Sequence, residues 1–419
     1  MIKHISKIIW TERKINAWIL LELILVFCIL WFCTDYLYFT TKRYLEPKGF
    51  DIEHTYRIGI SMKEEGQAIS ASNDSIKKQE MLNDIWTIYD RIKRYPATEY
   101  ISYSQSAHPY SGSWMSNSIM NDSVQVYTQY KRVTPEFFDV FKIKRIAGTS
   151  FDWNNITSGN PVMISSDNTN MFGKTPVEKM EYIYYDDGNK DKVLGVVNKT
   201  KRSDYEYYNT IMYTPITKQR TSLIDYRELC IRVKPAADKN FEEQFTKDMR
   251  DQLEIGQYYL SSVTALEKDK ETYMQWTGYA NNFKSVYSIT AFLIINIFLG
   301  VIGSFWFRVQ SRHSEIGLRI ALGSSKANVM QMFIGESILL LFIASLVASI
   351  ICINISAADL LKSINVPIPD RREEAVNIGQ YFINYGITFI FLAIITIVAV
   401  WYPAWRASKI QPAIALKDE

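Results

Sequence analysis

The residues of this chain best placed to do chemistry are charged, and they gather in one short segment. Between residues 308 and 326 a single acid, Glu315, lies among five basic residues: Arg308, Arg312, His313, Arg319 and Lys326. Arg312, Glu315 and Arg319 follow each other at i, i+3 and i+7, which places them on one face of a helix, and Glu315 and Arg319 have the spacing of an ion pair. The pattern predicts a short amphipathic helix over 311–323 that can dock electrostatically.

The other side of this predicted helix is apolar, and its end is marked. Ile316 and Ile320 form the apolar stripe. Gly323 is expected to end the helix, and Ser324 or Ser325 to cap the next one. We therefore expect a helix that lies along a membrane with its polar face toward water.

Catalytic patterns are missing from the sequence. There is no G-x-x-x-x-G-K-[ST] phosphate loop, no G-x-S-x-G elbow and no H-E-x-x-H pair. The four histidines lack metal-ligand spacing, and only Cys230 of the four cysteines lies outside apolar runs. The sequence therefore predicts no catalytic residue, no metal site, no cofactor of its own and no disulfide in its polar middle.

The composition divides the chain between membrane and water. A formal net charge of +3 over 419 residues is too small to indicate a nucleic-acid partner. Apolar runs of membrane-spanning length predict four transmembrane helices, at 17–38, 286–307, 329–354 and 382–402. The first is read as an uncleaved anchor, because no small-x-small cleavage site follows it.

Basic residues flank these runs and predict their orientation. The segments 1–16 and 403–419 and the loop 308–328 are rich in Lys and Arg, so the positive-inside rule places all three in the cytoplasm. Pro403 is expected to end the fourth helix.

Some residues of the predicted spans should mediate helix contacts. Gly300 and Ser304, and likewise Ala344 and Ala348, form small-xxx-small faces suited to close packing. Two acids lie within the spans, Glu22 and Glu336. Glu22 is interpreted as an interfacial acid that faces solvent or a neighbouring helix, with a polar contact between subunits as the alternative.

Residues 39–284 are polar and predict one large extracytoplasmic domain. Alternating or apolar runs indicate strands at 55–61, 123–130, 193–197, 211–216 and 228–234. Helices are predicted at 76–94 and 239–254. The predicted fold class is thus an α+β outer domain joined to an α-helical membrane domain, with one span before the outer domain and three after it.

Three phrases carry a resemblance to a known family. The first is EIGLRIALGSS followed by an apolar helix with an early Glu336, and the second is the tail YPAWRASKIQPAIALKDE. Both resemble MacB-like and FtsX-like ABC transporter permeases. KRVTPEFFDVFKIKRIAGTSF resembles a phrase of the MacB-type outer domain, although Thr149 stands where that family has an arginine.

The resemblance implies how the chain is divided. The outer domain would have a porter-like lobe, about 45–130 and 223–275, interrupted by a β-rich lobe at about 131–222. Residues 285–419 would be the FtsX-like permease domain. MacB-like proteins carry an ATPase domain before the first span, so the ATPase is expected on a separate polypeptide that binds ATP.

The resemblance also implies a function. Two ATPase subunits and a second permease, identical or homologous, would act with this chain in a bacterial inner membrane. ATP-driven motion would enter through Arg312, Glu315, Gly317, Arg319 and Gly323 and reach the periplasmic domain, which is called mechanotransmission. A periplasmic adaptor, an outer-membrane channel and membrane lipids are further expected partners, and peptides, antibiotics or lipoproteins the expected cargo. The alternatives are a membrane receptor or regulator that senses a ligand without transport, and an envelope enzyme.

Overall fold

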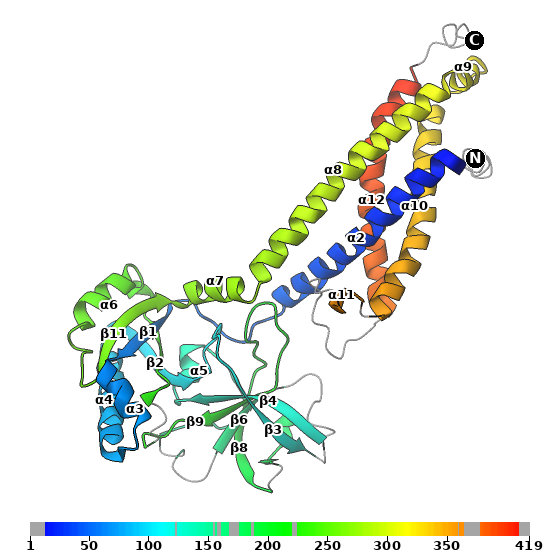
Figure 1. The fold of residues 1–419 in the computed structure, drawn as a ribbon. Coiled ribbons are helices and arrows are strands. Elements are labelled where there is room, and N and C mark those ends of the chain that lie inside the picture. The colour runs from blue at the N-terminus through cyan, green and yellow to red at the C-terminus, as the bar shows by residue number, and fades with distance from the viewer. Residues whose placement is uncertain are drawn as a thin grey trace. The chain divides into compact units, whose positions relative to one another are not determined.

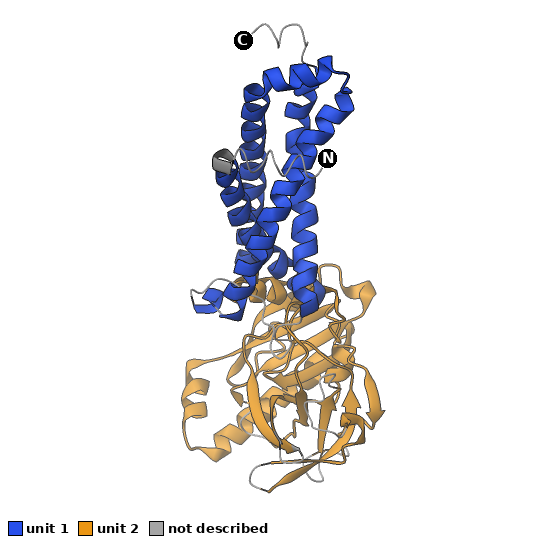
Figure 2. Ribbon diagram, turned by 90° about the vertical axis from the view of Figure 1, so that its right-hand side faces the viewer, with its two compact units in different colours: residues 1–42, 280–419 blue, residues 43–279 orange. Residues whose placement is uncertain are grey.

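The computed structural model divides the chain into two compact units, which Figure 2 colours separately. We call residues 1–42 and 280–419 the membrane unit and residues 43–279 the sheet unit. The structure describes residues 13–121, 124–153, 156, 161–166, 176–185, 188–219, 224–358, 360–363 and 378–409. The predicted cytoplasmic ends 1–12 and 410–419, with the last part of the tail motif, lie outside the described residues.

The membrane unit is built from long apolar helices (Figure 1). Among the described residues, four helices are long and apolar enough to cross a membrane: α2 (Arg13–Leu45), α8 (Tyr279–Ser311), α10 (Lys326–Ala357) and α12 (Ile378–Ala407). Two short helices accompany them, α9 (His313–Ala321) and α11 (Leu360–Ser363). One apolar helix therefore precedes the sheet unit and three follow it, as predicted.

Each long helix extends beyond the predicted span, and Pro403 does not end α12. The helix continues through Pro403 to Ala407. Proline removes one backbone donor and crowds the preceding turn, but it does not forbid helix around it. Here Pro403 is buried, and the neighbouring Ala404 and Ala407 are fully buried in the helix core, so tertiary packing holds the last turn. The expected end at Pro403 is therefore wrong.

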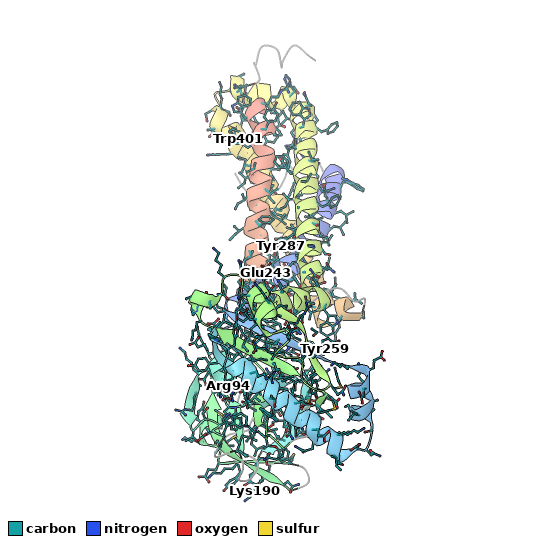
Figure 3. All side chains as sticks on the ribbon, turned by 90° about the vertical axis from the view of Figure 1, so that its left-hand side faces the viewer. Arg94, Lys190, Glu243, Tyr259, Tyr287 and Trp401 are labelled. Atoms are coloured by element: carbon teal, nitrogen blue, oxygen red, sulfur yellow. The ribbon has the colours of Figure 1, made fainter. Side chains whose placement is uncertain are left out.

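Side chains on the outside of the helices are those expected against lipid. Tyr287 on α8 and Trp401 on α12 are labelled in Figure 3, and both are largely exposed. Near the end of α12, Arg406 lies over the Trp306 ring at 4.4 Å and Lys409 over the Trp405 ring at 3.7 Å. Aromatic rings beside basic residues are typical of a membrane–water boundary.

The sheet unit contains a continuous mixed sheet with the strand order β11-β1-β10-β2-β4-β3-β7-β8-β6-β9, and β5 pairs with β8. Its strands are β1 (Thr55–Met62), β2 (Thr98–Gln105), β3 (Met115–Asn121), β4 (Val124–Val133), β5 (Arg145–Gly148), β6 (Pro161–Ser165), β7 (Tyr182–Tyr184), β8 (Lys190–Val197), β9 (Ile211–Pro215), β10 (Glu228–Val233) and β11 (Tyr258–Ala265). Its helices are α3 (Glu64–Ala71), α4 (Ser75–Lys93), α5 (Phe137–Val140), α6 (Phe241–Met249) and α7 (Leu266–Trp276), with 3-10 turns at Val177–Lys179 and Pro235–Ala237.

The first lobe of the sheet unit repeats a β-α-β unit. The sequences β1–α4–β2 and β10–α6–β11 interleave in the order β11-β1-β10-β2, which is the split β-α-β arrangement. Asp74 starts α4 by accepting hydrogen bonds from the Ile76 and Lys77 backbone N–H groups. One side of α4 then buries Leu82, Ile85 and Ile88 against the sheet.

The predicted boundary between the two lobes, at about residues 130 and 131, coincides with a strand. It falls within β4, which is one uninterrupted strand. β4 pairs with β2 at its end, through Ser104↔Val133, and with β3 and β9 along its length. β3 and β4 therefore belong to the sheet of the second lobe, and pairing across β2 and β4 joins the lobes, which local sequence patterns do not reveal.

Candidate coupling site in the membrane unit

Arg312 is not on the polar face of the predicted amphipathic helix. The helix α9 begins at His313, and Arg312 is the preceding residue, with non-helical backbone angles of φ −109° and ψ 23°. Its carbonyl accepts the first hydrogen bond of α9, from the Ile316 N–H at 3.0 Å. Its side chain is buried rather than turned to water. The position at the junction of α8 and α9 changes its direction, so the prediction for Arg312 is corrected.

Arg312 instead helps to enclose a buried carboxylate. Glu336 of α10 accepts a hydrogen bond from Arg308 at the end of α8 through Oε1, and from Arg312 Nη1 through Oε2 at 3.0 Å. Arg308 also donates to Asn16 Oδ1 of α2. We call Asn16, Arg308, Arg312 and Glu336 the buried charge cluster. Arg308 and Glu336 are each 1% exposed, and the cluster joins three long helices to the start of α9.

The energetics of such a cluster favour a defined geometry over raw stability. The two guanidinium groups and the carboxylate are all buried, so desolvation offsets most of their attraction. Removing one member of a buried ion pair is generally far worse, about 3–5 kcal/mol, because the charge of the other member stays buried. The arrangement therefore fixes where α9 leaves α8, since any shift of α9 must move Arg312 relative to Glu336.

The rest of α9 exposes an ion pair on one side and buries an apolar residue and a glycine on the other. Glu315 and Arg319 form the expected i,i+4 ion pair, with 2.7 Å between Oε1 and Nη2, and both side chains are partly exposed. Ile316 and Gly317 are buried, and Ile320 packs against the helix core. The ion pair therefore lies on the accessible side of α9, and the apolar stripe packs toward the helix core.

The exit from α9 follows the predicted signals. Gly323 adopts a left-handed backbone with φ +96°, and the Ser324 N–H reaches back to the Arg319 carbonyl at 2.9 Å. Ser325 then caps α10 by accepting from the Asn328 N–H at 3.2 Å. Leu322, which directly follows α9, is 79% exposed, so the accessible surface at the end of this helix includes an apolar side chain.

The predicted packing residues lie in two different environments. A Cβ at Gly300 would approach Glu22 Oε1 to 2.2 Å, so the missing side chain on α8 makes room for the carboxyl of α2. Ser304 is half-buried. Ala344 and Ala348 are fully buried on α10, where the Ala348 carbonyl lies 3.8 Å from Cys28 Sγ of α2.

Sequence reasoning missed several buried polar residues of the helices. Asn384 of α12 donates to Asp35 Oδ1 of α2 at 2.5 Å, and Thr388 lies 3.2 Å from Thr34 between the same helices. Asp35 and Asn384 are each nearly inaccessible. Charged residues in apolar helices are rare and usually face other helices. Their presence in the sequence would therefore have pointed to Asp35 and Arg308.

The described residues hold no group of three or more His, Cys, Asp or Glu side chains suited to a metal ion. All four cysteines are free thiols, and Cys230 is buried in the sheet unit.

Residues 287–412, which include α9 and the charge cluster's arginines and Glu336, match the family model of the FtsX-like permease C-terminal domain. The chain is 30% identical over 121 residues to a macrolide export ATP-binding/permease protein MacB from Syntrophobacter fumaroxidans, over 29% of this chain and 15% of that protein. It is 22% identical over 293 residues to MacB of Haemophilus ducreyi, over 68% of this chain and 40% of that protein.

A third relative is closer in extent. YvrN of Bacillus subtilis, described as an uncharacterized ABC transporter permease, is 22% identical over 307 residues, which are 70% of this chain and 71% of that protein. The chain spans less than half the length of the two MacB relatives above.

Two solved structures are similar to part of the chain. The extracellular domain of the ABC-type transporter YknZ from Gram-positive bacteria matches with a TM-score of 0.33 and 15% identity, over 50% of this chain and all of that domain. The periplasmic region of MacB from Actinobacillus actinomycetemcomitans matches with a TM-score of 0.33 and 11% identity, over 55% of this chain and 96% of that region. From these matches, residues 287–412 form an FtsX-like permease domain, and the chain is similar in sequence to MacB-type ABC transporter permeases.

Proposed function

We propose that this chain is the membrane subunit of an ABC transporter in which a partner ATPase drives conformational work in the sheet unit. The observation that carries the proposal is the buried charge cluster beneath α9. An ATPase that pushes on the partly exposed Glu315–Arg319 pair would transmit force to Arg312 and Glu336, and through them to α8, α10 and α2. This is the mechanotransmission that the family resemblance implies.

The partners follow from the same reasoning. Two ATPase subunits would bind ATP, with one α9 seated on each, and a second permease would complete the pair. An adaptor and an outer-membrane channel would dock on the sheet unit. This chain would bind no cofactor and catalyse no reaction, because its sequence lacks the phosphate-loop and catalytic motifs named above. It would contact no nucleic acid, because its formal net charge is only +3.

The orientation is proposed from charge. The described end of the helices near α9 carries Arg308, Arg319, Lys326, Arg406 and Lys409, which favours the cytoplasm for that end. Both termini would then lie inside, with the sheet unit in the periplasm of a bacterial inner membrane.

The cargo is proposed only as a class. MacB relatives are named for macrolide export. For this chain we propose efflux or export of peptides, antibiotics or lipoproteins that reach the sheet unit.

The test is a charge reversal that keeps the net charge of the loop. In the double variant Glu315→Arg, Arg319→Glu, both groups remain able to pair with each other, but each meets the wrong partner across an interface. We expect normal membrane levels, weaker co-purification of the ATPase and loss of transport-coupled ATP turnover. The matched control reverses Lys63 and Glu254, an exposed ion pair of the sheet unit at 2.8 Å. If the α9 double variant binds the ATPase and supports turnover like the control, α9 is not the seat.

A further inference from the structure

A cavity of about 550 Å³ lies in the sheet unit, on the side of the first lobe's sheet that faces away from α4 and α6. Ile58 of β1 points toward these helices and is fully buried, so Arg57 and Gly59, on the alternate face, point the other way. The volume is in the range of pockets that hold small ligands. The cavity is lined by residues of β1, β10, β11, α7 and the loop 106–114.

A glycine in the middle of the sheet creates the floor of this cavity. Gly59 pairs with Glu228 on β10 and with Ser262 on β11. A Cβ at Gly59 would come within 2.3 Å of Ser262 Oγ. Glycine weakens the interior of a strand. Its presence there therefore often marks a place where a ligand or another backbone approaches closely.

One wall is held in a strained conformation by buried groups. Ser106 and Tyr110 have left-handed backbones, with φ of 52° and 61°, which non-glycine residues adopt at a cost. Glu228 accepts from the Ser106 and Ala107 N–H groups at 2.9 and 3.1 Å, and the buried Lys131 donates to the Ala107 carbonyl at 2.9 Å. The wall is therefore fixed before any ligand arrives, which reduces the entropy lost on binding.

Two guanidinium groups on the cavity keep donors available. Arg57 gives Nε and Nη2 to Asp269 at 2.6 and 2.8 Å. Arg227 gives Nε to the Ile60 carbonyl and Nη1 to the Ile224 carbonyl at 3.0 and 2.8 Å. Among the described residues, Arg57 Nη1 and Arg227 Nη2 have no hydrogen-bond acceptor. These donors suit the carbonyl or hydroxyl oxygens of a ligand.

The charge of the lining disfavours an anionic ligand. Asp225, Glu228 and Asp269 outnumber the two arginines by one, so the cavity has a net charge of −1. Its mouth carries two exposed aromatic side chains, Tyr226 at 46% and Trp276 at 68%. Exposed aromatic rings beside fixed polar groups are typical of a surface that binds an amphipathic molecule.

We propose that this cavity binds an uncharged or singly cationic amphipathic molecule whose carbonyl oxygens lie beside an aromatic or aliphatic group, as in an end-capped peptide. The oxygens would meet Arg57 and Arg227, and the apolar group would lie against Trp276 and Tyr226. Treating this molecule as transport cargo rests on the proposed function, whereas binding itself does not. Equilibrium binding without the ATPase therefore separates the two.

The experiment uses the full chain in detergent and the probe N-acetyl-Ala-Ala-Phe-amide, followed by calorimetry and by ligand-observed NMR. We expect saturable binding with a Kd of about 1 mM or tighter. The same peptide with a free carboxylate should bind about tenfold more weakly, because the cavity is net negative. An amphipathic, uncharged compound without peptide bonds but with carbonyl oxygens, such as a benzyl ester, distinguishes peptide from non-peptide sources of the same chemistry.

A cavity-filling variant and a matched control locate the site. Thr272 on α7 lines the cavity and is exposed, so Thr272→Trp fills the space without disturbing a core. Glu271→Trp adds the same bulk at the neighbouring exposed position, which does not line the cavity. We expect Thr272→Trp to weaken binding at least about tenfold and Glu271→Trp to leave it unchanged.

Three results would overturn the proposal: no saturable binding of the capped peptide, equal binding to the Thr272→Trp protein, or tighter binding of the carboxylate form. If binding holds while the Glu315→Arg, Arg319→Glu protein keeps its ATPase coupling, the cavity stands and the proposed coupling role of α9 fails.

Discussion

The charge cluster of the membrane unit supports a quantitative prediction for Glu336→Gln. The amide has the shape of the carboxylate and can still accept one hydrogen bond, but it carries no charge. Arg308 and Arg312 are 1% and 6% exposed, and each would lose its ion pair with this carboxylate. Breaking a buried pair costs about 3–5 kcal/mol. For a unit of this size, that loss lowers the melting temperature by about 10 °C.

The assay follows unfolding of the membrane unit alone. In a Cys230→Ala background the remaining thiols are Cys28, Cys33 and Cys352, all within the membrane unit, and Cys352 is fully buried. A maleimide dye that becomes fluorescent on reaction with these thiols during heating therefore reports when the helices separate. The full chain in detergent is the sample.

Two controls separate the charge effect from others. Glu22→Gln makes the same chemical change at a half-buried acid that has no ion pair among the described residues, and we expect a shift of less than about 2 °C. Replacing Arg308, Arg312 and Glu336 together by Met removes these three charges at once, and this variant should melt well above the single variant, since apolar replacement of buried ion pairs is often neutral. A Glu336→Gln protein that melts like the Glu22→Gln protein would refute the reasoning.

Three further predictions follow from other parts of the molecule. First, cysteines at Met120 and Ala415 in a Cys-free background should differ in intact spheroplasts: Met120→Cys labels from outside and Ala415→Cys does not, and outside labelling of the latter would contradict the topology. Second, Cys28 and Cys352 lie against each other's helices, with Cys352 Sγ 4.0 Å from the Cys28 carbonyl. Oxidation with copper phenanthroline should therefore form a Cys28–Cys352 disulfide that joins α2 to α10. After cleavage within residues 43–279 the two fragments should stay linked, whereas the fragments of a Cys352→Ala chain should separate. Third, burial lowers the pKa of Lys131 from 10.5 to about 8. The unfolded chain then binds more protons than the folded chain between pH 8 and 10.5. The free-energy cost of burying the charged lysine is therefore complete below pH 8 and disappears as the pH rises through that window. Measured by denaturant unfolding, the free energy of unfolding of the wild-type sheet unit should rise by about 3 kcal/mol relative to that of Lys131→Met across this pH range. A difference that does not change with pH would show that Lys131 is not buried as a charge.

The sequence by itself determined the elements whose signals are local. Apolar runs located α2, α8, α10 and α12, because about 20 apolar residues are needed to cross a bilayer wherever they occur. Alternation located β1, β4, β8, β9 and β10 to within a few residues. The i,i+4 spacing gave the Glu315–Arg319 pair, and Gly323 marked the end of α9, because a left-handed turn selects glycine locally.

Tertiary structure decided what depends on distant parts of the chain. Arg312 lies next in sequence to exposed α9, yet it is buried because Glu336, 24 residues later, offers it a carboxylate. Pro403 stays helical because its neighbours are packed, and β4 joins two lobes because its partners β2 and β9 come from both sides of it in the chain. The cavity over Gly59 requires three strands, a strained loop and α7 to meet, so no local pattern could show it. Pairing and burial depend on segments that are far apart in the chain, so the sequence around a residue does not specify its tertiary partner.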